Sequence, residues 1–146
     1  MLGNLYLHTG RPKQAVVVFR QALLLNPSDV ERQDNLANAY MQNSQQEDAE
    51  HILQSIISTQ AYAPAYNGLG FIALQRHQLA IAQRNFAYAV QLDPDYAEAQ
   101  YNLGMVCLQT NDIPCARSAL KEFLPKATPA YASFVPQVKA ALSALK

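Results

Sequence analysis

The sequence carries little charge and no surplus of either sign. Asp, Glu, Lys and Arg make up 15% of its 146 residues, with 11 basic side chains against 11 acidic ones. An average globular protein has roughly 25% charged residues. Because nucleic-acid binding depends on surplus Lys and Arg to displace counterions, this balance argues against a nucleic-acid partner.

Long apolar runs are also missing. No stretch approaches the roughly 20 apolar residues that a membrane-spanning helix needs. The opening MLGNLYLHTG has neither the basic nor the apolar region of a secretory signal. We therefore expect no membrane span. A cytoplasmic location is favoured, and a periplasmic location is the alternative if an upstream signal has been removed.

The sequence lacks the common motifs of catalysis and of cofactor binding. No GxGxxG, GxxxxGK[ST], CxxC or HExxH pattern occurs. His8, His51 and His77 are scattered along the chain, and no Ser or Cys has an evident base beside it. We expect no enzyme activity, no catalytic residue, no metal site and no cofactor.

Cysteine is nearly absent, with Cys107 and Cys115 as the only two. The preferred interpretation is that Cys107 is a small buried apolar residue and that Cys115 is a free thiol at the surface. The alternative is a disulfide between the two, which an oxidising compartment would permit.

What the sequence does contain is a repeat of 33 or 34 residues. Leu-Gly or Leu-Ala pairs begin at Leu2, Leu36, Leu69 and Leu103. Two further series keep the same spacing: Ala15, Ala49, Ala82 and Ala116, and Phe19, Leu53, Phe86 and Leu120. The sequence therefore predicts four copies of one structural unit.

Each repeat contains two helical patterns joined by a short polar break. In the third repeat Ala82, Phe86 and Ala89 share one face of the second helix. Gly or Ala at the recurring small positions lets two helices cross closely, and the neighbouring Leu or Phe fills the groove. Pro27 and Pro94 prevent the second helices of the first and third repeats from continuing.

The order Leu2-Gly3, Tyr6, Ala15, Phe19, Ala22 and Pro27 resembles the tetratricopeptide repeat (TPR). The resemblance covers about residues 1–124 and implies an all-α fold, a superhelical solenoid of antiparallel helix pairs. It implies one domain over 1–146, with repeats at about 1–29, 30–62, 63–96 and 97–128 and a C-terminal capping helix at about 129–146. The aromatic position of the first helix holds Gln33 and Gln100, so the geometry of the turns before them is not predicted.

TPR proteins generally hold a peptide or a protein surface on a concave wall built from the first helices. The resemblance therefore implies a non-catalytic interaction module or scaffold. Eight candidate ligand-binding residues fall on this wall: Asn35, Asn38, Asn67, Phe71, Leu74, Tyr101, Asn102 and Met105. Asn side chains can donate to and accept from a peptide backbone. Because the assigned wall has acids but no cation, the expected ligand is a neutral to mildly basic protein or peptide.

Other interpretations stay open. The chain could be the substrate-recruitment or regulatory domain of a larger enzyme, or a bacterial envelope or pilus-assembly factor. Weak self-association through Leu2, Leu5 and Tyr6 at the N-terminal end is also expected. A run of basic residues near the C-terminus is interpreted as a solvated surface, with a docking face as the alternative: Arg117, Lys121, Lys126, Lys139 and Lys146.

Overall fold

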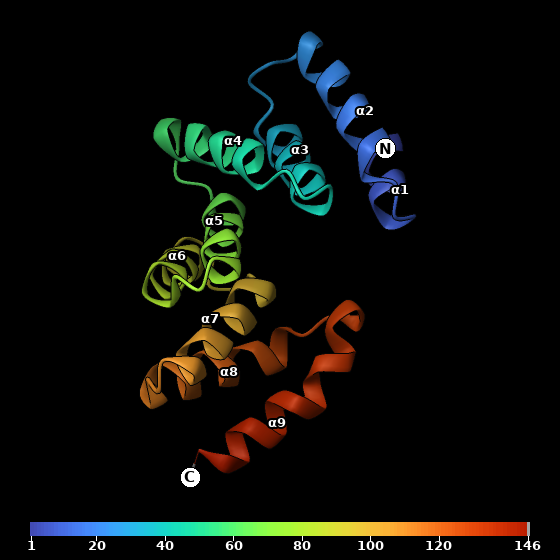
Figure 1. Cartoon of the computed structure of the whole chain (residues 1–146). Helices are drawn as coiled ribbons and strands as arrows, with labels where there is room; N and C mark the ends of the chain where they lie inside the picture. Colours follow the sequence, from blue (N-terminus) through green and yellow to red (C-terminus); the bar gives the residue numbers. More distant parts are fainter. Residues whose placement is uncertain (146) are drawn as a thin grey trace. The chain divides into compact units, whose positions relative to one another are not determined.

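The protein is described by a computed structural model in which residues 1–145 are placed. Within that range every regular element is a helix (Figure 1). Four pairs follow one another: α1 (Leu2–His8) and α2 (Pro12–Leu25), α3 (Val30–Gln42) and α4 (Gln46–Thr59), α5 (Ala63–Gln75) and α6 (Leu79–Leu92), and α7 (Ala97–Gln109) and α8 (Ile113–Lys126). A 3₁₀ helix, η1 (Pro129–Phe134), and α9 (Val135–Ala144) complete the chain. The predicted all-α fold is confirmed.

The chain divides into two compact units, and the division falls inside α5. Unit 1 is Met1–Leu69 and unit 2 is Gly70–Lys146. Each unit has its own apolar core. Ala15, Phe19 and Leu36 belong to the core of unit 1, and Phe86 and Val106 belong to that of unit 2. The prediction of one domain over residues 1–146 stays a prediction.

The turn inside each helix pair uses the same backbone device. Gly10, Ser44, His77 and Asn111 all have a φ close to +60°, and each lies just before the second helix of its pair. A left-handed residue at this point ends the first helix and reverses the chain. The same turn therefore recurs in all four pairs although only one of the four residues is glycine.

The predicted packing role of the recurring glycines is confirmed. A Cβ atom on Gly70 would lie 2.7 Å from the ring of Phe86, and one on Gly104 would clash with Leu120. Phe86 and Leu120 are both fully buried. A larger residue at either glycine would push the first helix away from the second, so these positions serve packing and not phosphate binding.

The two glutamines at the aromatic position also have a structural role. Gln33 Nε2 donates to the carbonyl oxygen of Pro27 at 2.7 Å. Gln100 Nε2 donates to that of Pro94 at 3.2 Å. Both contacts span six residues, so each glutamine closes the turn that leads into its own helix by satisfying a carbonyl group there.

The end of unit 2 is covered by η1 and α9. Val138 of α9 is fully buried, and the side chain of Arg117 on α8 donates to the carbonyl oxygen of Leu145. The predicted capping helix is thus present, but it is divided. Pro129 and Pro136 each lie in the first turn of their helix, where the missing N–H is not needed. None of the helices in residues 1–145 is long and apolar enough to cross a membrane.

The preferred interpretation of the cysteines as unlinked residues is wrong. Cys107 on α7 and Cys115 on α8 form a disulfide, with Cα atoms 5.9 Å apart. Cys107 is buried as expected, but Cys115 is not a free thiol. Asp112 links the two helix ends, because its N–H donates to the Cys107 carbonyl oxygen at 2.9 Å and its side chain accepts from the Cys115 N–H.

Candidate functional site

The candidate residues of unit 1 lie on α3 and α5. Asn35 and Asn38 are half-buried on α3, and Asn38 Nδ2 donates to the Asp34 carboxylate at 3.3 Å. Asn67 on α5 is only 5% exposed. A ligand can therefore reach the two amides on α3 directly, whereas Asn67 is much less accessible than a contact residue should be.

The candidate residues of unit 2 lie on α5 and α7. Phe71 is 40% exposed. Leu74 is half-buried and packs against the core of unit 2. Asn102 and Met105 are half-buried on α7. Phe71 is thus the most accessible apolar residue among the eight candidates.

Tyr101, the eighth candidate, is packed among the chain's own aromatic rings. Its ring centroid lies 5.5 Å from that of Phe123 on α8 and 4.9 Å from that of Phe134 in η1. Tyr131 lies beside both Phe123 and Phe134. Tyr101 therefore contributes to holding the C-terminal segment. The sequence analysis missed this role, although three aromatic residues shortly after α7 were the available signal.

Acidic groups dominate the start of α3. The pKa of Tyr62 is raised by burial and then by the charges of Asp34, Glu31 and Asp29. Arg32 forms an ion pair with Asp29 at 3.1 Å, and Asp29 also caps α3 by accepting from the Arg32 N–H. The negative potential at this helix end would favour a ligand with a neutral or positive group there.

Glu98 gives the start of α7 a similar acidic character, but this carboxylate is bound by another side chain of the protein. The Tyr131 hydroxyl donates to Glu98 Oε2 at 3.0 Å. Burial, followed by the charge of Glu98 and this hydrogen bond, raises the pKa of Tyr131 to about 12. Glu98 therefore fixes η1 against α7.

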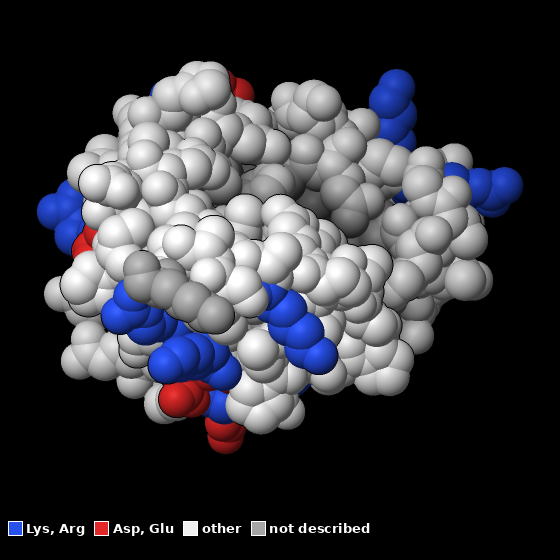
Figure 2. Space-filling view, turned by 90° about the horizontal axis from the view of Figure 1, so that it is seen from below, with Lys and Arg blue, Asp and Glu red and all other residues white. Residues whose placement is uncertain are grey.

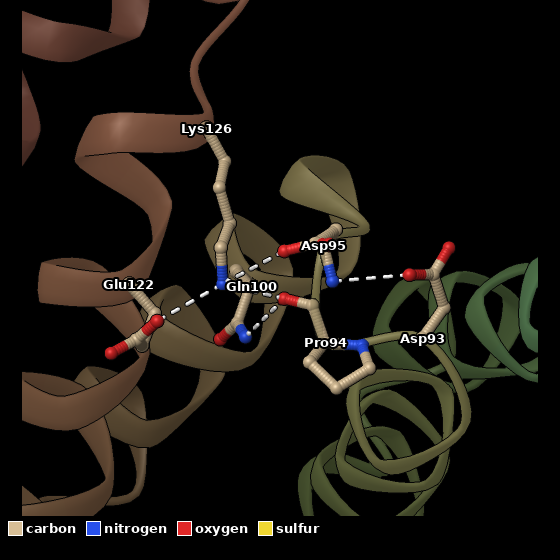
Figure 3. Close-up of polar contacts among 6 residues, drawn as sticks. All are labelled: Asp93, Pro94, Asp95, Gln100, Glu122 and Lys126. Atoms are coloured by element: carbon tan, nitrogen blue, oxygen red, sulfur yellow. Dashed lines mark hydrogen bonds and ion pairs between the residues drawn. The ribbon is translucent and has the colours of Figure 1, made fainter.

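The basic C-terminal residues are not equivalent. Figure 2 shows Lys and Arg side chains gathered on one face beside a few acidic groups, and Arg117, Lys121 and Lys139 are exposed. Lys126 is engaged instead in the network of Figure 3. Its Nζ donates to the Pro94 carbonyl oxygen at 2.7 Å and forms ion pairs with Glu122 at 3.0 Å and Asp95 at 3.6 Å. Lys146 lies outside the described residues.

The hydrogen bond to Glu122 is the largest contribution to the raised pKa of Lys126. This lysine joins the turn between α6 and α7 to the end of α8, and Gln100 joins the same turn to α7. Lys126 therefore has a structural role, and a docking face built from the basic residues would have to rely on Arg117, Lys121 and Lys139.

One group of metal-ligand types occurs among residues 1–145. Atoms of Cys107, Asp112 and Cys115 lie within 4.8 Å of one another. Both sulfur atoms are used in the disulfide. The two oxygens of Asp112 accept from the Cys115 N–H at 3.2 Å and from Gln83 Nε2 at 3.0 Å. These three residues lie together because they connect α8 to its neighbours, and with the disulfide formed they do not provide a metal centre.

A repeated pair of antiparallel helices, with a small residue at each crossing, defines a helical-repeat protein. Sequence profiles of the tetratricopeptide repeat match residues 3–69 and 67–132. The chain belongs to the tetratricopeptide repeat family. No curated protein sequence matches it.

Solved structures show the same fold. The chain superposes on the crystal structure of MamA with a TM-score of 0.74 and 20% identity, covering 99% of this chain and 82% of that one. It superposes on pilF of Pseudomonas aeruginosa with a TM-score of 0.81 and 24% identity, covering 99% of this chain and 64% of that one. It also superposes on TTC0263, a thermophilic TPR protein of Thermus thermophilus, with a TM-score of 0.76 and 24% identity. This match covers 99% of this chain and 77% of that one. At these identities the likeness concerns the fold alone.

Proposed function

We propose that this chain is a non-catalytic interaction module that binds a peptide or protein segment on its first helices. TPR domains bind proteins or peptides, and the fold is generally a non-catalytic scaffold. The observation that carries the proposal is the 40% exposure of Phe71 on the first helix α5, where the core of unit 2 leaves a large apolar ring uncovered.

The other first-helix candidates suit a peptide backbone. Asn35 and Asn38 on α3 and Asn102 on α7 are half-buried amides, and an amide can pair with either a backbone N–H or a carbonyl group. Met105 offers a flexible apolar contact beside Asn102 on α7. Unit 1 thus offers amides on α3, and unit 2 offers an amide and an apolar group on α7.

The charge of the ligand follows from the acids at the helix starts. Glu31 and Asp34 on α3 act on the same tyrosine, Tyr62. A strongly acidic segment would be repelled there, so the ligand of this surface is neutral to mildly basic. Its affinity is modest, because the ordering of a flexible peptide offsets much of the contact energy.

The test begins with a pull-down by the intact chain, followed by synthesis of the retained partner's binding segment. The Phe71→Ala variant should weaken binding of that peptide about tenfold, since a truncated apolar anchor loses roughly 1.4 kcal/mol or more. Ile81→Ala is the matched control, because Ile81 is also 40% exposed but lies on the second helix α6. Equal affinities for Phe71→Ala, Asn35→Ala and the wild type would contradict the proposal.

The two alternative roles, recruitment within a larger enzyme and envelope or pilus assembly, have no separate support among the described residues. The likeness to pilF is limited to the fold, and the chain spans 64% of that structure. The general interaction role is therefore the one we propose.

A further inference from the structure

The four second helices can be compared position by position, because the repeat places their outer faces in register. The outer face of α2 is formed by Val17, Arg20, Gln21 and Leu24. The corresponding residues are His51, Gln54, Ser55 and Ser58 on α4, Arg84, Ala87, Tyr88 and Gln91 on α6, and Ser118, Lys121, Glu122 and Pro125 on α8. All sixteen side chains are exposed. Among these four faces only that of α2 carries two branched aliphatic residues, so it differs from its three counterparts.

These aliphatic residues are well exposed. Val17 is 54% exposed and Leu24 is 82% exposed. Positions i, i+3, i+4 and i+7 lie on one side of a helix, so Val17, Arg20, Gln21 and Leu24 form a stripe about two turns long. At the positions of Val17 and Leu24 the other three pairs have His51 and Ser58, Arg84 and Gln91, and Ser118 and Pro125. Packing therefore does not require Val17 or Leu24 to be branched aliphatic residues.

The stripe is hollowed as well as apolar. A shallow hollow of about 290 Å³ is lined by Val16, Val17, Arg20, Gln21 and Leu24. A second hollow of about 310 Å³ is lined by Tyr6, Lys13, Gln14, Val17 and Val18. Val17 belongs to both, so the two hollows adjoin along α2. Each has an apolar floor and one cation at its edge.

The charged residues of the segment that contains the stripe have one sign. Residues 1–28 contain Arg11, Lys13 and Arg20 but no Asp or Glu. All three cations are exposed. The first acidic residue along the chain is Asp29, which is engaged with Arg32. A partner on this face would therefore find apolar contacts flanked by positive charge, the opposite of the acidic start of α3.

We propose that the outer face of α2 is a second docking surface, which takes an acidic amphipathic helix of a partner protein. Two apolar residues of such a helix, spaced by one or two turns, would enter the hollows beside Val17 and Leu24. Its carboxylates would pair with Lys13 and Arg20. This surface is separate from the first-helix surface and does not depend on it.

Two other occupants fit less well. In a two-fold contact with a second copy, identical faces meet, so Lys13 and Arg20 would lie near their own counterparts with no acid between them. A membrane surface is contacted by apolar side chains on a strongly basic helix, whereas α2 has only two cations, Lys13 and Arg20.

The test is a selection of peptides on the purified full chain. A random library of peptides about 16 residues long, roughly four helical turns, is displayed and enriched by binding. We expect a class of acidic peptides with apolar residues at i, i+3 or i+4, and i+7. Individual members of this class are then synthesised, and their dissociation constants are measured by fluorescence anisotropy.

The variants assign the binding to α2. Val17→Ser with Leu24→Ser should raise the dissociation constant of the acidic peptides at least about tenfold, and Arg20→Glu should raise it about fivefold. Matched controls at the same repeat positions, Arg84→Ser with Gln91→Ser on α6 and Lys121→Glu on α8, should leave it unchanged. Phe71→Ala should also have no effect, which separates this surface from the first-helix one.

The outcomes that would overturn the proposal are distinct. One is enrichment of neutral or basic peptides only. Another is an acidic class whose affinity survives the α2 variants. A third is sedimentation of a dimer that becomes monomeric in Val17→Ser with Leu24→Ser, which would make a second copy the occupant. The last is binding to phosphatidylglycerol vesicles that those substitutions abolish, with no acidic peptides selected.

Discussion

At Gly70 a single methyl group decides the packing of α5 beside Phe86. Gly→Ala in a helix interior normally stabilises by roughly 0.5–1 kcal/mol. Here the new Cβ would lie 2.7 Å from the ring of the fully buried Phe86. We expect Gly70→Ala to lower the free energy of unfolding by about 1–3 kcal/mol, measured by urea denaturation.

Gly68→Ala is the control for this substitution. Its Cβ would meet the terminal methyl group of Leu53 at 2.8 Å. A methyl at the end of a Leu side chain can shift more easily than a buried ring, so the loss should be smaller than for Gly70→Ala. A stabilised Gly70→Ala variant would show that the close crossing at Phe86 is wrong.

At the scale of single helix pairs, the disulfide should stabilise the pair of α7 and α8 more than any other pair. Cys107 and Cys115 are eight positions apart in the sequence and join α7 to α8. By the chain-entropy estimate, closing such a short loop stabilises the folded state by about 2–3 kcal/mol. We expect dithiothreitol to lower the midpoint of denaturant unfolding accordingly, and the bond to persist only in an oxidising compartment.

The doubly substituted Cys107→Ala, Cys115→Ala protein is the control, because reductant should not change its unfolding curve. Alkylation of both cysteines in the folded protein without any reductant, detected by mass spectrometry, would contradict the bridge.

The attachment of η1 should depend on pH. The pKa of Tyr131 is raised from 10.0 to about 12 by burial and by Glu98, so the folded state favours the neutral phenol. This stabilisation is fully present below pH 10 and is lost as the pH rises through about 12. After correction for the base-catalysed intrinsic rate, we expect the protection of amides in η1 and α9 from hydrogen exchange to fall over this range before the protection in α7 and α8 falls.

Tyr131→Phe removes the titrating group and should abolish that pH dependence. When the pH is raised through about 12, the increase in tyrosinate absorbance of this variant should be smaller than that of the wild type by the contribution of one tyrosine. Retention of the same pH-dependent exchange in this variant would assign the effect to another group.

At the scale of the whole molecule, the repeat phase explains why the helix pairs could be predicted. Leu2, Leu36, Leu69 and Leu103 recur in register, and each repeat holds two helices whose apolar residues follow a 3.6-residue period. The crossing at Gly70 was predictable for the same reason. A periodic sequence thus specifies its helices through local patterns that agree with one another.

Contacts that do not repeat could not be predicted in this way. The repeat does not indicate whether Cys107 and Cys115 are oxidised, because their spacing suits either state. The C-terminal segment is outside the repeat, so its contact with Tyr101 through Phe134 was not foreseen. The burial of Asn67 is likewise a tertiary property that its polar side chain does not reveal.

The most direct test of the central claim is a chemical-shift map of the chain with its partner's binding segment. If the segment binds the first helices, the backbone amide signals that move should belong to α3, α5 and α7, with Phe71 and Asn102 among the residues that shift most. The exposed residues of α4, α6 and α8 should stay unchanged. A map confined to Arg117, Lys121 and Lys139, with α3, α5 and α7 silent, would contradict the account and assign binding to the basic C-terminal residues.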